Sequence, residues 1–322
     1  MNSSPKLAVV IVNYRTASMV VDCLAALAVS GTVPDNTGVV VVDGASGDDS
    51  CEIIATAIQR NGWSDRVGFL PLSVNGGFAY GNNRGLEHAI ARFGRPDYVL
   101  FLNPDTVPRA GGLAPLVAFM DASPRAGIAG SRLEDPDETQ QACAFRFPSP
   151  INEFESQIRF GPMTRLFQRW RVVREFSKEP IAVDWVSGAS MIVRMQVIDE
   201  IGVMDEDFFL YYEELDFCRR AAQRGWECWH VPQSRVVHLV GQSTGVTLRH
   251  GKRPRRPPYW FESRRRYYAK HHGRLYAAGA DLAWIGGQFL WQVRQWIQRR
   301  PVTDPPYLLS DFLRHLGLPK AP

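Results

Sequence analysis

The sequence predicts an α/β fold built on a parallel sheet, because apolar runs of strand length alternate with segments of helical periodicity. The expected strands are Leu7–Val12, Val39–Val42, Val67–Leu72 and Tyr98–Leu102. The expected helices are Ser18–Ala28, Ser50–Ile58, Gly85–Arg92 and Gly112–Met120. Strands joined through helices run parallel, so their carboxyl ends share one edge of the sheet, where ligands bind in such folds.

The second half of the chain is less regular. From Glu134 to Pro180 the periodicity loosens, and we interpret this stretch as a variable insert or a substrate-facing region. Val183–Met195 then predicts an apolar strand interrupted by Gly188, a residue type that lets a backbone or a ligand approach closely. We expect a main domain over residues 1–245 and a basic, aromatic, helical extension over residues 246–322.

The composition is that of a globular protein. The 322 residues are 45% hydrophobic, enough for one large domain with an appendage or for two domains. The five cysteines are odd in number, widely spaced and without a CxxC pair, so neither a disulfide framework nor a zinc knuckle is predicted. The apolar run near the N-terminus is too short for a signal peptide. These features predict a cytoplasmic location.

Basic residues gather toward the C-terminus. Arg249–Arg274 holds ten Lys or Arg residues against Glu262 alone, which leaves a net charge of −5 for the rest of a chain whose total is +4. Such a block is either a solvated face or a contact for an anionic surface.

The neighbouring segment Leu275–Ile297 is rich in apolar residues and includes Trp284, Trp291 and Trp296. Asp281 and several glutamines and glycines interrupt it, whereas a membrane span needs about 20 predominantly apolar residues. Tryptophan beside Arg and Lys suits the headgroup zone of an anionic membrane. Two interpretations stay open: a helix that lies on a membrane, and a helix that packs on the main domain.

Three carboxylates crowd one predicted helical turn. Glu213, Glu214 and Asp216 begin a helix that Gly225 would end. They can be structural, because amide groups at a helix N-terminus stabilise anions and Asp216 can pair with Arg220 four residues on. Alternatively, one carboxylate is a general base that deprotonates a substrate hydroxyl.

Two aspartates closely follow predicted strands. Asp43 can accept hydrogen bonds from a pyrimidine or a ribose, or it can form an ordinary turn with Gly44. Asp105, in the sequence Asn103-Pro104-Asp105, can close a turn or bind Mg²⁺, which keeps much of its hydration and needs few protein ligands.

The segment Asn75–Gly85 combines four glycines with three asparagines. Glycines let backbone N–H groups approach a diphosphate or a sugar, and the alternative is a flexible surface loop. The pattern GxxxxGK[ST] is absent, so this segment is not an ATPase P-loop.

Taken together and in order, these segments resemble the motifs of inverting family-two glycosyltransferases of the GT-A fold, most closely those of the bacterial rhamnosyltransferase-like branch. The segments are VIVNYR (Val10–Arg15), VVVVDGAS (Val39–Ser46), NGGFAYGNNRG (Asn75–Gly85), FLNPD (Phe101–Asp105), SGAS (Ser187–Ser190), YYEELDFCRR (Tyr211–Arg220) and HLVGQS (His238–Ser243). Several ordered motifs are far more specific than any one alone, and they cover about three quarters of the chain.

The resemblance implies a Rossmann-like, mostly parallel sheet flanked by helices, with a catalytic domain over residues 1–245. It implies that Glu214 is the base, with Glu213 and Asp216 as neighbours and alternatives. It implies that Asp105 binds Mg²⁺ or Mn²⁺, and that His238 binds the same ion or contacts the diphosphate. The residues expected to bind the nucleotide sugar are Asn13, Tyr14, Asp43, Asn75, Phe78, Asn82, Asn103 and Gly188.

The chain departs from the family pattern in two places. It has Asp-Gly-Ala-Ser from Asp43 to Ser46, where relatives typically have Asp-Asn-Gly-Ser. It has Glu214 where many relatives have aspartate, and the extra methylene moves the carboxyl group outward. The first change bears on the shape of the loop after the second strand, and the second on which carboxylate is the base.

The activity that the resemblance implies is transfer of a sugar, with inversion, from a nucleoside-diphosphate donor to a saccharide hydroxyl during cell-surface polysaccharide synthesis. The expected donor is dTDP-rhamnose, with a UDP-sugar as second choice. The expected acceptor is polyprenyl-linked, at the inner face of the cytoplasmic membrane, so a peripheral membrane protein is expected. No nucleic-acid partner is expected.

Two other classes of protein account for less of the sequence. A sugar-nucleotide pyrophosphorylase would have a Gly-rich loop with Arg and Lys after its first strand, where this chain reads NYRTASM. A non-catalytic protein that binds an anionic polymer would account for Arg249–Arg274 but would leave the carboxylates and Asn103-Pro104-Asp105 unexplained.

Overall fold

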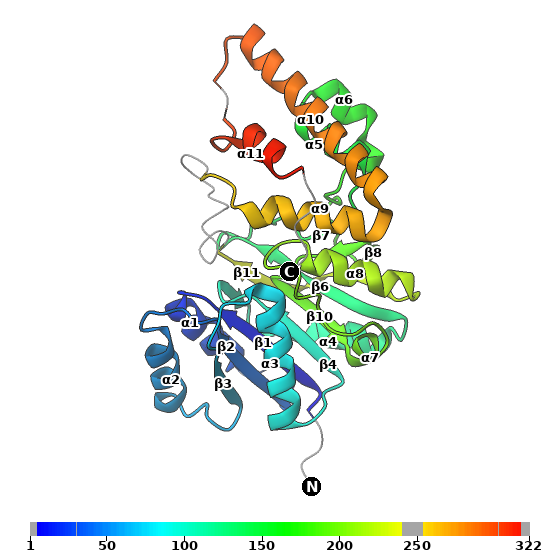
Figure 1. Cartoon of the computed structure of the whole chain (residues 1–322). Helices are drawn as coiled ribbons and strands as arrows, with labels where there is room; N and C mark the ends of the chain where they lie inside the picture. Colours follow the sequence, from blue (N-terminus) through cyan, green and yellow to red (C-terminus); the bar gives the residue numbers. More distant parts are fainter. Residues whose placement is uncertain (1–4, 30, 240–253, 302, 317–322) are drawn as a thin grey trace. The chain divides into compact units, whose positions relative to one another are not determined.

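A computed structural model describes residues 5–29, 31–239, 254–301 and 303–316 (Figure 1). The chain divides into two compact units. The first comprises Met1–Phe145, Glu175–Phe209 and Glu213–Ser243, and the second comprises Arg146–Arg174, Leu210–Tyr212 and Thr244–Pro322. The boundary expected between residues 245 and 246 lies outside the described residues and stays a prediction.

The first unit is built on a sheet that has nine strands among the described residues, in the order β3-β2-β1-β4-β10-β6-β11-β5, with β8 beside β11. The strands are β1 (Leu7–Asn13), β2 (Thr37–Asp43), β3 (Val67–Pro71), β4 (Tyr98–Leu102), β5 (Thr106–Pro108), β6 (Ala126–Glu134), β8 (Ile181–Val183), β10 (Ser190–Arg194) and β11 (Glu227–His238). Two further short strands, β7 (Ala144–Phe145) and β9 (Trp185–Val186), pair with each other.

β1, β2, β3 and β4, which come from the N-terminal part of the chain, run parallel to one another. The alternation of apolar and periodic segments predicts this arrangement. β10 then enters antiparallel between β4 and β6, pairing Ser190 with Leu102 and Met191 with Gly130. Because β10 runs the other way, the residues just before it lie at the carboxyl edge of β1, β2 and β4. The predicted α/β class, with helices flanking a central sheet and further helices at the C-terminal end, is confirmed.

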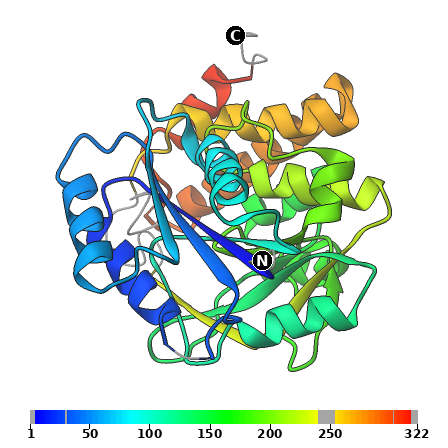
Figure 2. The same cartoon turned by 90° about the horizontal axis from the view of Figure 1, so that it is seen from below.

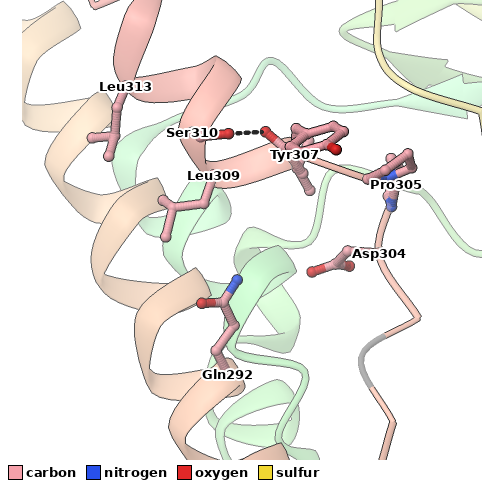
Figure 3. A pocket seen from close by; sticks show the side chains of 9 residues that line it. Gln292, Asp304, Pro305, Tyr307, Leu309, Ser310 and Leu313 are labelled. Carbon is pink, nitrogen blue, oxygen red and sulfur yellow. Dashed lines mark hydrogen bonds between the residues drawn. The ribbon is translucent and has the colours of Figure 1, made fainter.

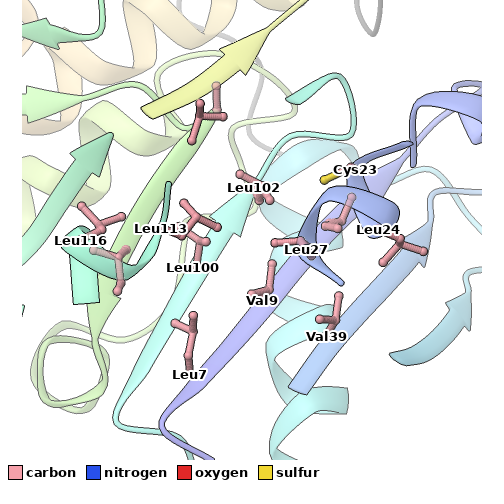
Figure 4. Packing of buried hydrophobic residues seen from close by; sticks show 14 of the residues in the cluster. Leu7, Val9, Cys23, Leu24, Leu27, Val39, Leu100, Leu102, Leu113 and Leu116 are labelled. Carbon is pink, nitrogen blue, oxygen red and sulfur yellow. The ribbon is translucent and has the colours of Figure 1, made fainter. Parts of the chain in front are cut away.

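Helices cover both faces of this sheet. On one face, α1 (Ala17–Leu27), α2 (Ser50–Arg60) and α4 (Ala114–Ala122) pack on the odd-numbered residues of β1 in one buried apolar cluster. Figure 4 shows Leu24 and Leu27 of α1 over Val9 and Val39. α3 (Gly77–Phe93) covers the opposite face, and the two layers are visible from below in Figure 2. α7 (Met195–Ile201) and α8 (Glu213–Gln223) complete the unit.

α3 begins eight residues earlier than the periodicity predicts, at Gly77 rather than Gly85. The expectation that Asn75–Gly85 is a glycine-rich loop is therefore wrong for most of its length. A Cβ on Gly81 would lie 2.7 Å from a Val12 methyl group, and one on Gly85 would overlap a methyl group of Val10. These two glycines let α3 approach the sheet closely.

The second unit is helical. Its elements are α5 (Pro150–Ile158), α6 (Gly161–Leu166), the 3-10 turn η1 (Gln168–Trp170), α9 (Pro258–His272), α10 (Arg274–Ile297) and α11 (Leu308–Arg314). Buried Arg264 of α9 joins α5 to α10, since its Nε lies 3.1 Å from Glu153 and its Nη1 lies 2.6 Å from Asp281. Part of the basic block is thus neutralised inside this unit.

Two of the three tryptophans of α10 do not fit the interpretation that this helix lies on a membrane. Trp284 and Trp291 are buried, and Trp284 stacks on Phe312 of α11, whereas Trp296 is exposed. In the described ranges, α10 included, we find no helix with the length and apolar character of a membrane span.

Candidate active site

The predicted site residues converge on the carboxyl edge of the sheet. β1 ends at Asn13, β2 at Asp43 and β4 just before Asn103. The N–H of Asn103 donates to the carbonyl of Ala189, 3.0 Å away, which ties this edge to the segment before β10. β11 reaches the same edge at His238, which pairs with Thr106. Segments far apart in the sequence are thereby brought to one edge.

Asp43 and Asn13 form a buried polar pair. Asn13 Nδ2 donates to Asp43 Oδ1 at 2.7 Å, and Ser46 donates to the same carboxylate through Oγ at 2.6 Å and through its backbone N–H at 3.0 Å. Tyr14 is exposed at the end of β1, with the Arg15 guanidinium 5.1 Å from the centre of its ring. The pair and Tyr14 form one end of the candidate site.

The loop after β2 has an alanine in an unusual backbone conformation. Ala45 has a φ of 56°, in the left-handed region that glycine adopts without steric cost. Arg15 contacts the loop from β1, because its Nε donates to the carbonyl of Ser46 at 2.9 Å. The loop therefore holds a strained alanine where relatives typically have glycine.

The start of α3 connects this end of the site to α8. Asn75 is exposed, and its Oδ1 accepts from the N–H of Gly77 at 3.0 Å. A Cβ on Gly188 would lie 3.5 Å from the Phe78 ring and 3.7 Å from Glu214 Cβ, so these three residues are neighbours. Asn82 is buried, and its Nδ2 donates to the carbonyl of Phe78 at 3.0 Å.

Asp105 and His238 face each other. Asp105 is buried, and its Oδ1 lies 3.6 Å from His238 Nε2. On the other side of the imidazole, Nδ1 is 3.1 Å from Gln141 Oε1. Gln141 Nε2 donates to Asp135 Oδ1 and to the carbonyl of His238, both at 2.8 Å, so Oε1 is the acceptor and His238 Nδ1 carries the hydrogen.

This tautomer bears on metal binding. In neutral His238, the Nε2 lone pair is directed at the carboxylate of Asp105, so the arrangement fits a positive charge between the two, either a proton on Nε2 or a cation. Two ligands of one divalent ion, each about 2.1 Å from it, lie about 3 to 4 Å apart, a range that includes the observed separation. In the described parts of the chain, no group of three or more His, Cys, Asp and Glu residues could hold a metal.

The three carboxylates of α8 lie in different environments. Asp216 is fully buried and accepts from Arg220 Nε at 2.8 Å, which matches its structural interpretation. Glu213 is buried, whereas Glu214 is half-buried. Oε2 of each glutamate has no hydrogen-bond partner among the described residues.

Burial changes the acidity of both glutamates. It raises the pKa of Glu214 from an ordinary value near 4.5 to about 6, against the opposing effect of backbone N–H groups that include that of Gly188. Burial raises the pKa of Glu213 well above its ordinary range, and the neighbouring charge of Glu214 raises it further. Near neutral pH, Glu214 is therefore largely ionised, and Glu213 holds its proton to higher pH than an ordinary glutamate does.

Sequence reasoning missed Gln141 and Ser46. Gln141 lies in an irregular stretch after β6, where nothing in the sequence indicates contact with His238. Ser46 stands in the VVVVDGAS segment, and its position three residues after Asp43 is a typical turn spacing that could have indicated the bond. Two pockets of about 660 Å³ and 560 Å³ among the described residues are lined by other residues.

Comparison with known proteins adds an independent line of argument. The family model described as glycosyl transferase family 2 matches residues 8–177, and one described as glycosyl transferase family group 2 matches residues 98–303. The N-acetylglucosaminyl-diphospho-decaprenol L-rhamnosyltransferase of Mycobacterium tuberculosis is 29% identical over 250 residues, which are 74% of this chain and 78% of that protein. The rhamnosyltransferase WbbL of Escherichia coli K12 is 24% identical over 167 residues, 51% of this chain and 61% of its own.

A solved structure supports the fold. The mannosyltransferase PcManGT from Pyrobaculum calidifontis, in complex with GDP-Man and Mn²⁺, superposes with a TM-score of 0.55 at 16% identity. The superposition covers 99% of this chain and 82% of that one.

Proposed function

Because the chain belongs to glycosyl transferase family 2, in its rhamnosyltransferase-like branch, and has the GT-A fold, we propose that it transfers rhamnose from dTDP-rhamnose to a saccharide hydroxyl with inversion of configuration. Membership in this family makes it a glycosyltransferase and excludes the pyrophosphorylase and the non-catalytic binder as its class. The donor, the stereochemistry, the metal and the residue roles below are parts of the proposal.

The proposal depends most on the state of Glu214. Of the three candidate carboxylates, Glu214 is half-buried and ionised near neutral pH, whereas Glu213 is buried with its pKa raised well above the ordinary range and Asp216 is paired with Arg220. A general base works best when its pKa lies near the working pH, and burial provides this for Glu214. Its proximity to Gly188 and Phe78, two residues expected to bind the nucleotide sugar, supports this role.

The reaction would proceed in one displacement. Glu214 accepts the proton of the acceptor hydroxyl as that oxygen forms its bond to the anomeric carbon. The bond from this carbon to the diphosphate oxygen breaks on the opposite side, so the configuration inverts and the nucleoside diphosphate leaves. No covalent bond to the protein forms at any stage.

Asp105 and His238 are the residues that would hold Mg²⁺ or Mn²⁺, and Gln141 would keep Nε2 of His238 available. A bound divalent ion would supply Lewis-acid stabilisation of the charge on the leaving diphosphate. Asn13, Asp43 and Ser46 form a rigid polar wall at the end of β1 and β2, suited to positioning the nucleoside.

The proposed acceptor is a polyprenyl diphosphate-linked saccharide at the inner face of the cytoplasmic membrane, in cell-wall polysaccharide synthesis. The support is the similarity to the Mycobacterium tuberculosis enzyme, whose name specifies a decaprenol-linked substrate. Such an acceptor would bring the protein to a membrane surface.

A donor screen tests the proposed function. The purified chain is incubated with dTDP-rhamnose, UDP-glucose or UDP-N-acetylglucosamine and a polyprenyl diphosphate-linked N-acetylglucosamine, with Mg²⁺, Mn²⁺ or a chelator. We expect dTDP release and a rhamnosylated product of inverted anomeric configuration with either metal, and no turnover with the chelator. Transfer from a UDP-sugar alone, or with retained configuration, would contradict the proposal.

A further inference from the structure

α10 has an outward face that is apolar throughout. Leu275, Leu282, Phe289 and Trp296 are 91%, 71%, 58% and 80% exposed. They recur every seven residues, so they form one stripe along a helix of 24 residues, about 36 Å long. The charged residues of the helix are Arg274 at its start, buried Asp281 and Arg294 near its end, and none of them lies within the stripe.

The inward face of the same helix carries its polar groups. Asp281, Gln288 and Gln295 are buried there. Asp281 is bound to Arg264, and Gln288 Nε2 donates to Asp304. A rotation that hid the stripe would break these buried polar contacts, which is costly because buried charges need their partners. The stripe is therefore held outward by the interior of its own unit.

Further apolar groups of the second unit are exposed. Figure 3 shows a pocket of about 560 Å³ between Gln292 of α10 and the segment around α11. Tyr307 and Leu313 line it and are themselves exposed. Isolated exposed apolar residues are common, but a continuous apolar stretch of this length marks a contact surface.

The charge of the second unit indicates what this surface contacts. Over its residues in the sequence, the second unit has 21 Lys or Arg against six Asp or Glu, whereas the first has 16 against 27. Exposed Arg274, Arg299 and Arg300 flank the stripe at its two ends, and Trp296 stands next to the last two. Apolar residues bounded by Arg and Trp are the pattern of a helix that lies in the plane of an anionic membrane surface.

We propose that the stripe Leu275, Leu282, Phe289 and Trp296 inserts into the surface of an anionic bilayer, with α10 parallel to the membrane plane. This inference rests on the proposed lipid-linked acceptor, which it would bring within reach of the enzyme. A second copy of the chain is a less suitable partner, because pairing the stripe with itself would also bring two units of strong positive charge together.

Vesicle flotation with the full chain tests the proposal. The vesicles contain phosphatidylglycerol and phosphatidylcholine in equal amounts, or phosphatidylcholine alone. Leu282→Glu and Phe289→Glu each remove an apolar contact and add a charge that anionic lipid repels. Each is expected to weaken partition by about tenfold or more, which corresponds to about 1.4 kcal/mol. Phe176→Glu, at an exposed aromatic residue of the first unit, is the matched control and should bind as the wild type does.

Fluorescence gives a second readout that does not depend on these charges. Brominated phospholipids should quench the emission of Trp296, and Trp296→Phe should abolish most of that quenching. Equal flotation of wild type and both Glu variants would overturn the proposal. So would a wild-type dimer, in light scattering without lipid, that Leu282→Glu converts to a monomer.

Turnover with a short, water-soluble acceptor separates this inference from the proposed function. The Glu variants should retain wild-type rates on that acceptor while losing vesicle binding. Loss of vesicle binding with intact turnover supports the membrane surface. Absence of turnover in wild type with intact vesicle binding would refute the proposed function and leave the membrane surface standing.

Discussion

Replacing each of the two adjacent glutamates by glutamine identifies the base. Glu214→Gln removes an ionised carboxylate, and a positioned base contributes about 10²–10⁴-fold, so kcat should fall by that factor. Glu213→Gln replaces a buried carboxyl group, whose pKa burial raises well above the ordinary range, with an amide of the same shape. This variant should stay within about tenfold of wild type, and it is the control for changes in packing.

The dependence of kcat/KM on pH measures how far the pKa of Glu214 is raised. With a pKa of about 6, Glu214 is about one tenth ionised at pH 5, whereas an ordinary value near 4.5 would leave it about three quarters ionised. We therefore expect kcat/KM at pH 5 to be about a tenth of its plateau, in wild type and in Glu213→Gln alike. The assay is initial-rate release of dTDP between pH 4.5 and 8, with donor binding measured by calorimetry at each pH.

Either of two results would refute this reasoning. One is a loss of activity in Glu213→Gln as large as that in Glu214→Gln, which would assign the base to Glu213. The other is an acidic limb centred below pH 5, which would mean that burial does not raise the pKa of the base. Unchanged donor affinity in both variants is needed for either conclusion.

The remaining predictions concern stability and the metal. Glu213 holds its proton to higher pH when folded than when unfolded, so the free energy of unfolding should fall as pH rises above about 4.5; urea titrations should show a smaller fall from pH 5 to 8 in Glu213→Gln. Gln141→Ala should weaken Mn²⁺ affinity by about 10–100-fold through His238, measured by electron paramagnetic resonance with dTDP present, and unchanged affinity would remove its positioning role. Gly85→Ala should destabilise by about 1–3 kcal/mol, whereas Gly286→Ala, at a helical glycine with open space around it, should be neutral or stabilising. Ala45→Gly should stabilise by about 1 kcal/mol in the same urea titrations, because it relieves a left-handed alanine, and a loss of stability would contradict that account.

The parallel part of the sheet was predictable because buried parallel strands form continuous apolar runs. Asp43 and Asp105 follow such runs, so their place at the carboxyl edge followed from the pattern. The antiparallel direction of β10 could not be predicted from the pattern, because it depends on pairing with β4 and β6, which are distant in the sequence.

Other features depend on which surfaces meet in three dimensions. In the sequence alone, Gly81 and Gly85 suggested a loop. Their role in packing the helix on the sheet is visible only in the structure, where Val10 and Val12 face them. Both faces of α10 contain large apolar groups, so periodicity alone could not show that Trp284 is inside and Trp296 outside. The roles expected for the site residues remain predictions that the experiments above address.

The junction between α3 and the segment before α8 includes a hydrogen bond between backbone groups. The N–H of Phe78 donates to the carbonyl of Phe209 at 2.8 Å, and any Cβ on Gly77 would collide with that carbonyl. Side chains reinforce this junction, because Asn83 Nδ2 donates to the carbonyl of Met204 at 2.9 Å. If Phe78 contacts the sugar as proposed, its side chain can be changed to alter sugar selection while its backbone bond to Phe209 stays in place. A Cβ on Gly77 would instead displace the start of α3 from this segment.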